Sequence, residues 1–195
     1  MTNKSNTESS GNVETIESLH LDFIHDVAFD HYGRRIATCS GDRRVKVWDL
    51  NEKGEWTFGS GSDWQAHRGS VTRVAWAHPE FGQLLATCGS DHSAAIWEER
   101  DASFSFPVGN TSYVHVGGDH ANSSANSAGD PSASVSRWVK KAELSDARKA
   151  VNCVEFAPRH LGLKIATGSA DGLVRIYEAI GEFFFHSSIP FNFSI

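Results

Sequence analysis

The stretch HDVAFDHYGRRIATCSGDRRVKVWD, residues 25–49, decides the fold of this chain. It contains an alternating apolar and polar run, the small apolar run IATC, a Ser-Gly-Asp turn and a second alternating run that ends at Trp48. Alternation of period two between turn residues indicates short β-strands joined by tight turns. The stretch therefore predicts a small antiparallel sheet.

Two further copies of this pattern follow along the chain. They read SVTRVAWAHPEFGQLLATCGSDHSAAIWE at residues 70–98 and AVNCVEFAPRHLGLKIATGSADGLVRIYE at residues 150–178. In each copy an aspartate precedes an aromatic residue by six positions, and the three pairs are Asp42 with Trp48, Asp91 with Trp97, and Asp171 with Tyr177. Three copies of one spacing indicate a repeat protein.

The interval between the second and third copies is too long for one repeat. Residues 101–136 are rich in Gly, Ser, Asn and Ala, which predicts a long, mobile surface loop. Alternation resumes at Trp138. We therefore expect the loop to leave a sheet after its third strand and to return at its fourth.

The repeats resemble WD repeats, which fold into the four-stranded blades of a β-propeller. A single sheet of this kind cannot bury both faces, whereas radial stacking of several sheets does. The resemblance implies an all-β fold, a partial WD-repeat β-propeller of three blades within residues 19–179. It also places a hydrogen-bonded tetrad at His67, Thr87, Asp91 and Trp97.

We interpret these four residues as structural, because such a network satisfies buried polar groups without any substrate. The first and third copies keep Asp42 with Trp48 and Asp171 with Tyr177, but neither shows a histidine at the spacing of the second copy. No catalytic, cofactor-binding or metal-binding residue is predicted.

Residues 21–179 are similar to the Seh-type nucleoporins, WD-repeat subunits of the Y-shaped nuclear pore scaffold. The matching segments include WAHPEFGQLLATCGSDHSAAIWEE, RWVKKAELSDARKAVNCVEFAP and HLGLKIATGSADGLVRIYEA. The segment AHPEFG also matches the sibling Sec-type propeller of the vesicle coat. The third copy, which ends SADGLVRIYEA, favours the nucleoporin.

The resemblance implies a six-bladed, open propeller completed by a blade from a helical nucleoporin, at the nuclear envelope and pore complex. It also implies a link to TOR-pathway nutrient signalling at the lysosomal or vacuolar membrane periphery. The alternatives are a vesicle-coat cage propeller and a generic WD-repeat adaptor.

Residues 1–18 are expected to form a disordered tail. Residues 180–195 form a divergent apolar tail, so we expect a chain truncated at its C-terminus relative to the family.

Composition excludes several other classes. The net charge is −6 and the basic residues are scattered, which argues against direct nucleic-acid binding. The N-terminus is polar and no apolar stretch is long enough for membrane insertion, so neither a signal peptide nor a membrane span is expected. No motif of a hydrolase or nucleotide-binding enzyme is present, so neither catalysis nor a small-molecule substrate is expected.

Three groups of residues suggest a functional site but have simpler interpretations. His115, Asp119 and His120 suggest a metal, but a structural metal site needs about four converging ligands. The three cysteines, Cys39, Cys88 and Cys153, lie in apolar runs and are expected to be reduced and buried. The arginines near the turns of the first copy, which are Arg34, Arg35, Arg43 and Arg44, are expected to be solvated.

Overall fold

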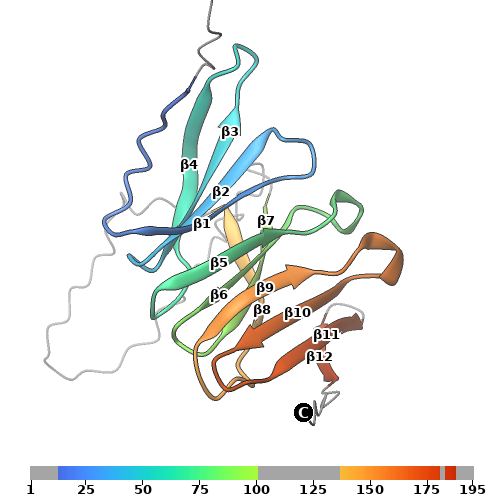
Figure 1. Cartoon of the computed structure of the whole chain (residues 1–195). Coiled ribbons are helices and arrows are strands. Elements are labelled where there is room, and N and C mark those ends of the chain that lie inside the picture. The colour runs from blue at the N-terminus through green and yellow to red at the C-terminus, as the bar shows by residue number, and fades with distance from the viewer. Residues whose placement is uncertain (1–12, 101–136, 181–182, 188–195) are drawn as a thin grey trace, which may run out of the picture.

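A computed structural model of the chain describes residues 13–100, 137–180 and 183–187 (Figure 1). These residues form three antiparallel sheets of four strands each, and the strands of each sheet follow one another along the chain. The first sheet contains β1 (Ile24–Phe29), β2 (Arg35–Ser40), β3 (Arg44–Leu50) and β4 (Trp56–Gln65). The second contains β5 (Val71–Trp76), β6 (Leu84–Gly89), β7 (Ala94–Glu99) and β8 (Trp138–Leu144). The third contains β9 (Val151–Phe156), β10 (Lys164–Ser169), β11 (Val174–Ile180) and β12 (Phe183–Ser187).

The three sheets stack side by side, and strand β5 contacts both β1 and β9 along the inner side. Short 3-10 turns, Pro79–Phe81 and Arg159–Leu161, connect the first and second strands of the second and third sheets. The predicted all-β partial propeller is confirmed, and each sheet is one blade.

Burial along the middle strands follows from this stacking. Every residue of β6 is buried, because the second blade is covered on both faces. In β10 burial alternates, with Ile165 and Thr167 buried and their neighbours partly exposed, because described residues cover only one face of the third blade. Strands with the same type of sequence are therefore fully buried only where a neighbouring blade covers both faces.

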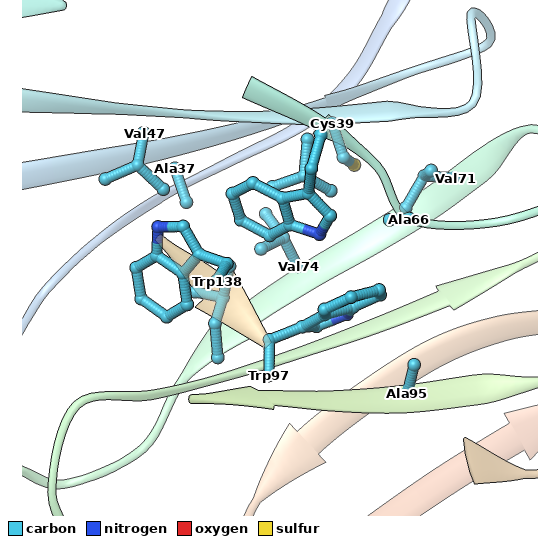
Figure 2. Close-up of a cluster of buried hydrophobic side chains, with 12 residues drawn as sticks. Ala37, Cys39, Val47, Ala66, Val71, Val74, Ala95, Trp97 and Trp138 are labelled. Carbon is cyan, nitrogen blue, oxygen red and sulfur yellow. The ribbon is translucent and has the colours of Figure 1, made fainter. Parts of the chain in front are cut away.

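Two apolar clusters lie between the blades. Trp64, Trp97 and Trp138 fill the space between the first and second blades, as Figure 2 shows for the cluster around Trp97 and Trp138. The rings of Trp64 and Trp138 stack with centroids 5.3 Å apart. A second cluster around Ile96 and Ile165 joins the second and third blades.

Hydrogen bonds also join the inner strands of neighbouring blades. The indole of Trp76 donates to the carbonyl of Ala28 at 3.0 Å, and the hydroxyl of Thr72 donates to the carbonyl of Val151 at 2.7 Å. These bonds satisfy polar groups at the inner edges of the sheets and fix the blades relative to one another.

Residues 100–137 separate the third and fourth strands of the second blade along the chain. Strand β7 ends at Glu99, β8 begins at Trp138, and the two strands pair. The loop residues 101–136 lie outside the described residues, as do 1–12 of the N-terminal tail and most of 181–195. Beyond Ala179 the third blade continues, since β12 pairs with β11 as its fourth strand.

The expectation of three buried thiols was wrong for one of them. Cys39 and Cys88 are buried, but Cys153 is exposed on the uncovered face of the third blade. Within the described residues no helix is long and apolar enough to cross a membrane.

Candidate functional site

The second blade brings its four predicted residues together. His67 Nδ1 lies 3.0 Å from an oxygen of Asp91, and His67 Nε2 lies 2.8 Å from the hydroxyl of Thr87. The indole of Trp97 donates to the same hydroxyl at 2.9 Å. The chain of bonds links the loop before β5, strand β6, the β6–β7 turn and strand β7.

Burial determines the protonation of this network. Desolvation lowers the pKa of His67 and outweighs the attraction of Asp91, so the imidazole is neutral near pH 7. A neutral ring satisfies every partner when Nδ1 donates to Asp91 and Nε2 accepts from Thr87. Burial opposes ionisation of Asp91, but His67, the Arg68 amide and Ser93 together hold the pKa of Asp91 below its usual value.

The first blade contains a histidine that the sequence analysis missed. His20 Nδ1 lies 2.8 Å from Asp42, and His20 Nε2 lies 2.9 Å from the hydroxyl of Thr38. Trp48 packs against Phe58 with ring centroids 4.7 Å apart. His20 precedes its aspartate by 22 positions whereas His67 precedes its own by 24, so a search at fixed spacing could not find it. A search that allowed the spacing between histidine and aspartate to vary by two residues would have found His20.

In the third blade, other residues occupy the place that the histidine network has in the first two blades. Asp171 pairs with Arg175 at 2.7 Å, and this bond is the main reason that the pKa of Asp171 is lowered and that of Arg175 raised. The hydroxyl of Tyr177 is hydrogen-bonded to Asp146 and to Thr167. Burial first, and then Asp146, raises the pKa of Tyr177 to about 12.

A single role of the three aspartates explains why they are present in all three blades while the histidine is present in the first two. Each carboxylate accepts a backbone N–H from the loop that enters its own blade, and the three donors are Leu21 at 3.0 Å, Arg68 at 2.8 Å and Arg148 at 3.0 Å. Each also accepts from the amide two residues further along its turn. Because only the carboxylate makes both sets of bonds, we expect it to be the essential member of each blade motif.

A cluster of charges ties the first blade to the second. Arg35 on β2 donates from both terminal nitrogens to Glu99, at 2.6 and 2.9 Å, and from Nε to Asp49 at 2.8 Å. Arg137 also donates to Glu99. The amide of Arg100 donates to the carbonyl of Arg137 at 2.8 Å, so the cluster holds the two ends of the loop 101–136.

The expectation that all four arginines of the first copy are solvated was therefore wrong for Arg35. Its side chain is 12% exposed, and its guanidinium lies 5.3 Å from the ring of Trp76 and 5.6 Å from that of Trp138. Arg34 and Arg43 are exposed, and Arg44 is partly exposed and paired with Asp63.

The first blade presents apolar side chains on the side away from the second blade. The exposed residues with their exposed fractions are Leu19 64%, Leu21 90%, Phe23 82%, Val27 58% and Phe29 60%. Val27 pairs with Thr38 and Phe29 with Ile36, so they share the face that carries the His20 network. Large apolar side chains exposed on one face are typical of a protein interface.

No group of three or more potential metal ligands occurs among the residues that the structure describes. His115, Asp119 and His120 lie outside those residues. The hydroxyl of Thr87 is fully buried and bonded to His67 and Trp97. The arrangement can fix blade geometry, and it leaves no room for a substrate at that hydroxyl.

Three antiparallel blades, each closed by an aspartate motif, define the class of WD-repeat propeller proteins. The family model described as "WD domain, G-beta repeat" matches residues 13–49, 59–98 and 138–178, and the chain belongs to this family. The curated protein nucleoporin SEH1 of Homo sapiens is 47% identical over 165 residues, which is 85% of this chain and 39% of that protein. The SEH1 nucleoporins of Bos taurus and Xenopus tropicalis match with the same identity and the same coverage. The resemblance to the Seh-type nucleoporins is confirmed, and the chain spans about two fifths of the length of these relatives.

Proposed function

We propose that this chain is a non-catalytic scaffold subunit of the nuclear pore complex, where it binds a helical nucleoporin and supports nucleocytoplasmic transport. The observation that carries the proposal is the identity of 47% to nucleoporin SEH1 over 85% of the chain.

The exposed apolar face of the first blade supports a protein partner. A partner strand or blade that packed on Val27 and Phe29 would remove them from water, at about 25 cal/mol for each Å² of apolar surface. The open edge of a sheet is the feature that β-augmentation uses. Roles in TOR-pathway signalling, and a place at the lysosomal or vacuolar membrane periphery, belong to the same proposal.

Affinity purification of the tagged chain from cells, followed by mass spectrometry, tests this function. We expect subunits of the Y-shaped scaffold to be enriched and the tagged chain to stain the nuclear rim. A matched variant with Val27→Glu and Phe29→Glu should lose these partners while the chain stays folded.

Other outcomes would assign the chain to an alternative. Enrichment of vesicle-coat cage subunits would make the chain a coat propeller, and enrichment of ubiquitin-ligase subunits would make it a WD-repeat adaptor. Either result would overturn the nuclear pore proposal.

A further inference from the structure

The first and third blades lie at the two ends of the stack, and each has a face that no described residue of another blade covers (Figure 1). We call the uncovered face of the first blade, with Ile24, Val27 and Phe29, the leading face. We call that of the third blade, with Ala166, Gly168 and Val174, the trailing face. The second blade is covered on both sides, so it shows what each of these faces contacts inside a stack.

The leading face carries side chains whose counterparts in the other two blades are buried. Val27, Val74 and Val154 have the same register position on β1, β5 and β9. Val74 and Val154 are each 4% exposed because each packs against the preceding blade, whereas Val27 is 58% exposed. Ile24 differs from its counterparts in the same way and is 48% exposed. The first blade is therefore built to pack on a preceding blade.

The trailing face shows the same contrast in the opposite direction. Val45, Ala94 and Val174 have the same register position on β3, β7 and β11. Val45 and Ala94 are 0% and 1% exposed because the following blade covers them, whereas Val174 is 60% exposed. Ala166 and Gly168 are partly exposed, although their counterparts on β2 and β6 are fully buried. The third blade is therefore built to pack on a following blade.

The leading and trailing faces are the two halves of a contact that occurs twice within the chain. At both contacts, small side chains such as alanine and cysteine of one blade pack on larger side chains of the next blade. At the second contact the hydroxyl of Thr72 also donates to the carbonyl of Val151 at 2.7 Å. Asn152, which is exposed, has the position of Thr72 in the third blade, and Ile24 has that of Val151 in the first. The amide of Asn152 can therefore make the equivalent bond to the carbonyl of Ile24 in another copy.

The number of blades limits how many copies such a contact can join. Propellers contain typically about four to eight blades. Two copies of a chain with three blades give twice three, or six, whereas three copies give nine. A head-to-tail contact that closes forms a ring and leaves no face uncovered.

We propose that the leading face of one copy of this chain packs on the trailing face of a second copy, so that two copies form one closed ring. The ring has two equivalent joints, each of the kind that already joins the blades within the chain. This continuity with the contacts inside the stack favours a second copy over an unrelated protein. The inference does not rest on the proposed function, although a scaffold partner on Val27 and Phe29 would compete with the second copy.

One residue beside the trailing face departs from the pattern of the other blades. Glu155 is exposed on β9, at the register position that Ala28 and Ala75 have on β1 and β5. In the joint its carboxylate loses water beside apolar side chains, which costs free energy. Glu155→Ala restores the residue of the other two blades, so it should lower the dissociation constant of the dimer by at least about tenfold.

Sedimentation velocity of the purified 195-residue chain, without any other protein, measures the assembly. We expect a species of twice the monomer mass whose fraction rises with concentration. Val27→Glu and Val174→Glu each place a charge in the joint and should weaken the dimer by at least about tenfold. The matched control Val13→Glu, at a residue that is 91% exposed and belongs to neither face, should change the affinity by less than about twofold.

Mixing the two variants tests the direction of the contact. The Val27→Glu copy keeps its trailing face and the Val174→Glu copy keeps its leading face, so an equal mixture should recover dimers through one intact joint. Recovery also shows that both variants are folded. A wild-type chain that stays monomeric would overturn the inference, as would assemblies larger than a dimer, dimers that persist in either variant, or a mixture without recovery.

The third blade separates this inference from the proposed function. Val174→Glu should abolish the dimer while the tagged chain keeps its scaffold partners, because those partners are expected on the first blade. A chain that dimerises but captures no scaffold subunit would support the ring and contradict the pore proposal. A monomeric chain that captures them would do the reverse.

Discussion

His20 Nδ1 lies 2.8 Å from Asp42 Oδ2, and the histidine belongs to the segment that precedes the first strand. The side chain of His20 is 1% exposed, and that of Asp42 is 5% exposed. The same segment places the carbonyl of Leu19 2.6 Å from the ammonium of Lys46, which is buried on β3. Residues ahead of β1 thus satisfy polar groups on a face of the first blade that the second blade does not reach.

Replacing His20 by alanine should therefore destabilise the first blade. The change removes the buried imidazole that bonds to both Asp42 and Thr38, at about 1 to 3 kcal/mol of unfolding free energy. Urea denaturation followed by tryptophan fluorescence measures this loss. His25→Ala, at an exposed position on β1, is the matched control and should change stability little. Equal stability of the two variants would contradict the role of His20.

The network of the second blade should depend on Asp91 and on Trp97. Asp91→Ala leaves the donors of His67 and Arg68 unpaired, at about 1 to 3 kcal/mol. Trp97→Ala opens a cavity in the core between the blades, at about 3 to 5 kcal/mol. Thermal denaturation of both variants tests whether Trp97→Ala costs more stability than Asp91→Ala. Glu14→Ala, at an exposed position, is the control. A melting temperature unchanged by either substitution would show that the motif is dispensable.

The sequence could predict the three blades because their signals are local. Alternation, turn residues and the six-residue spacing of Asp91 and Trp97 are contained within one copy of the repeat. The residues that close each motif were harder to predict, because they differ in type and in place: His20 and Asp146 come from the preceding loop, whereas Arg175 lies on β11. His20, Asp146 and Arg175 solve one problem in different ways, and only contacts in space reveal that they are equivalent.

Acid should weaken the second blade in two stages. The pKa of His67 is lower in the folded chain than its unfolded value of about 6.5, so the unfolded chain binds more protons below that pH. Unfolding free energy should therefore fall as pH decreases below about 6.5, and fall again below about 4, where Asp91 of the unfolded chain binds a proton more readily than the folded carboxylate does. Urea titrations across this range measure both stages. His67→Gln should remove the upper stage, while His160→Gln, at an exposed turn, should retain it.

The three thiols should differ in reactivity. Cys39 and Cys88 are fully buried, and burial raises the pKa of Cys88 to about 12, so neither is available as a thiolate. Cys153 is exposed. We expect a thiol reagent to modify one cysteine in the native chain and three in denaturant, as mass spectrometry would show. Cys153→Ser should abolish labelling of the native chain, and persistent labelling would place a buried cysteine within reach of solvent.

The cluster around Arg35 shows a second limit of prediction from sequence. Arg34 and Arg35 are adjacent, yet the first is exposed and the second bonds to Glu99, which lies 64 positions away on another blade. Strand alternation predicts that the two side chains point to opposite faces. Alternation alone does not predict which face contacts a neighbouring blade. It also does not predict that Glu99 of that blade lies within hydrogen-bonding distance of Arg35.

A double-mutant cycle on Arg35 and Glu99 should reveal a favourable coupling between the first two blades. Arg35→Ala leaves Glu99 with Arg137 as its remaining partner and removes a cation from beside Trp76, so we expect a loss of roughly 1.5 to 3 kcal/mol. Glu99→Gln should cost less when Arg35 is already absent, because the two residues share one interaction. Arg34→Ala, one residue earlier and exposed, is the control and should be nearly neutral.

Since the side chains of Arg35 and Glu99 are only 12% and 15% exposed, the coupling should also survive high salt, whereas a solvated pair would be screened. Strictly additive losses, or a coupling that disappears in about 1 M salt, would mean that the cluster does not hold the blades together.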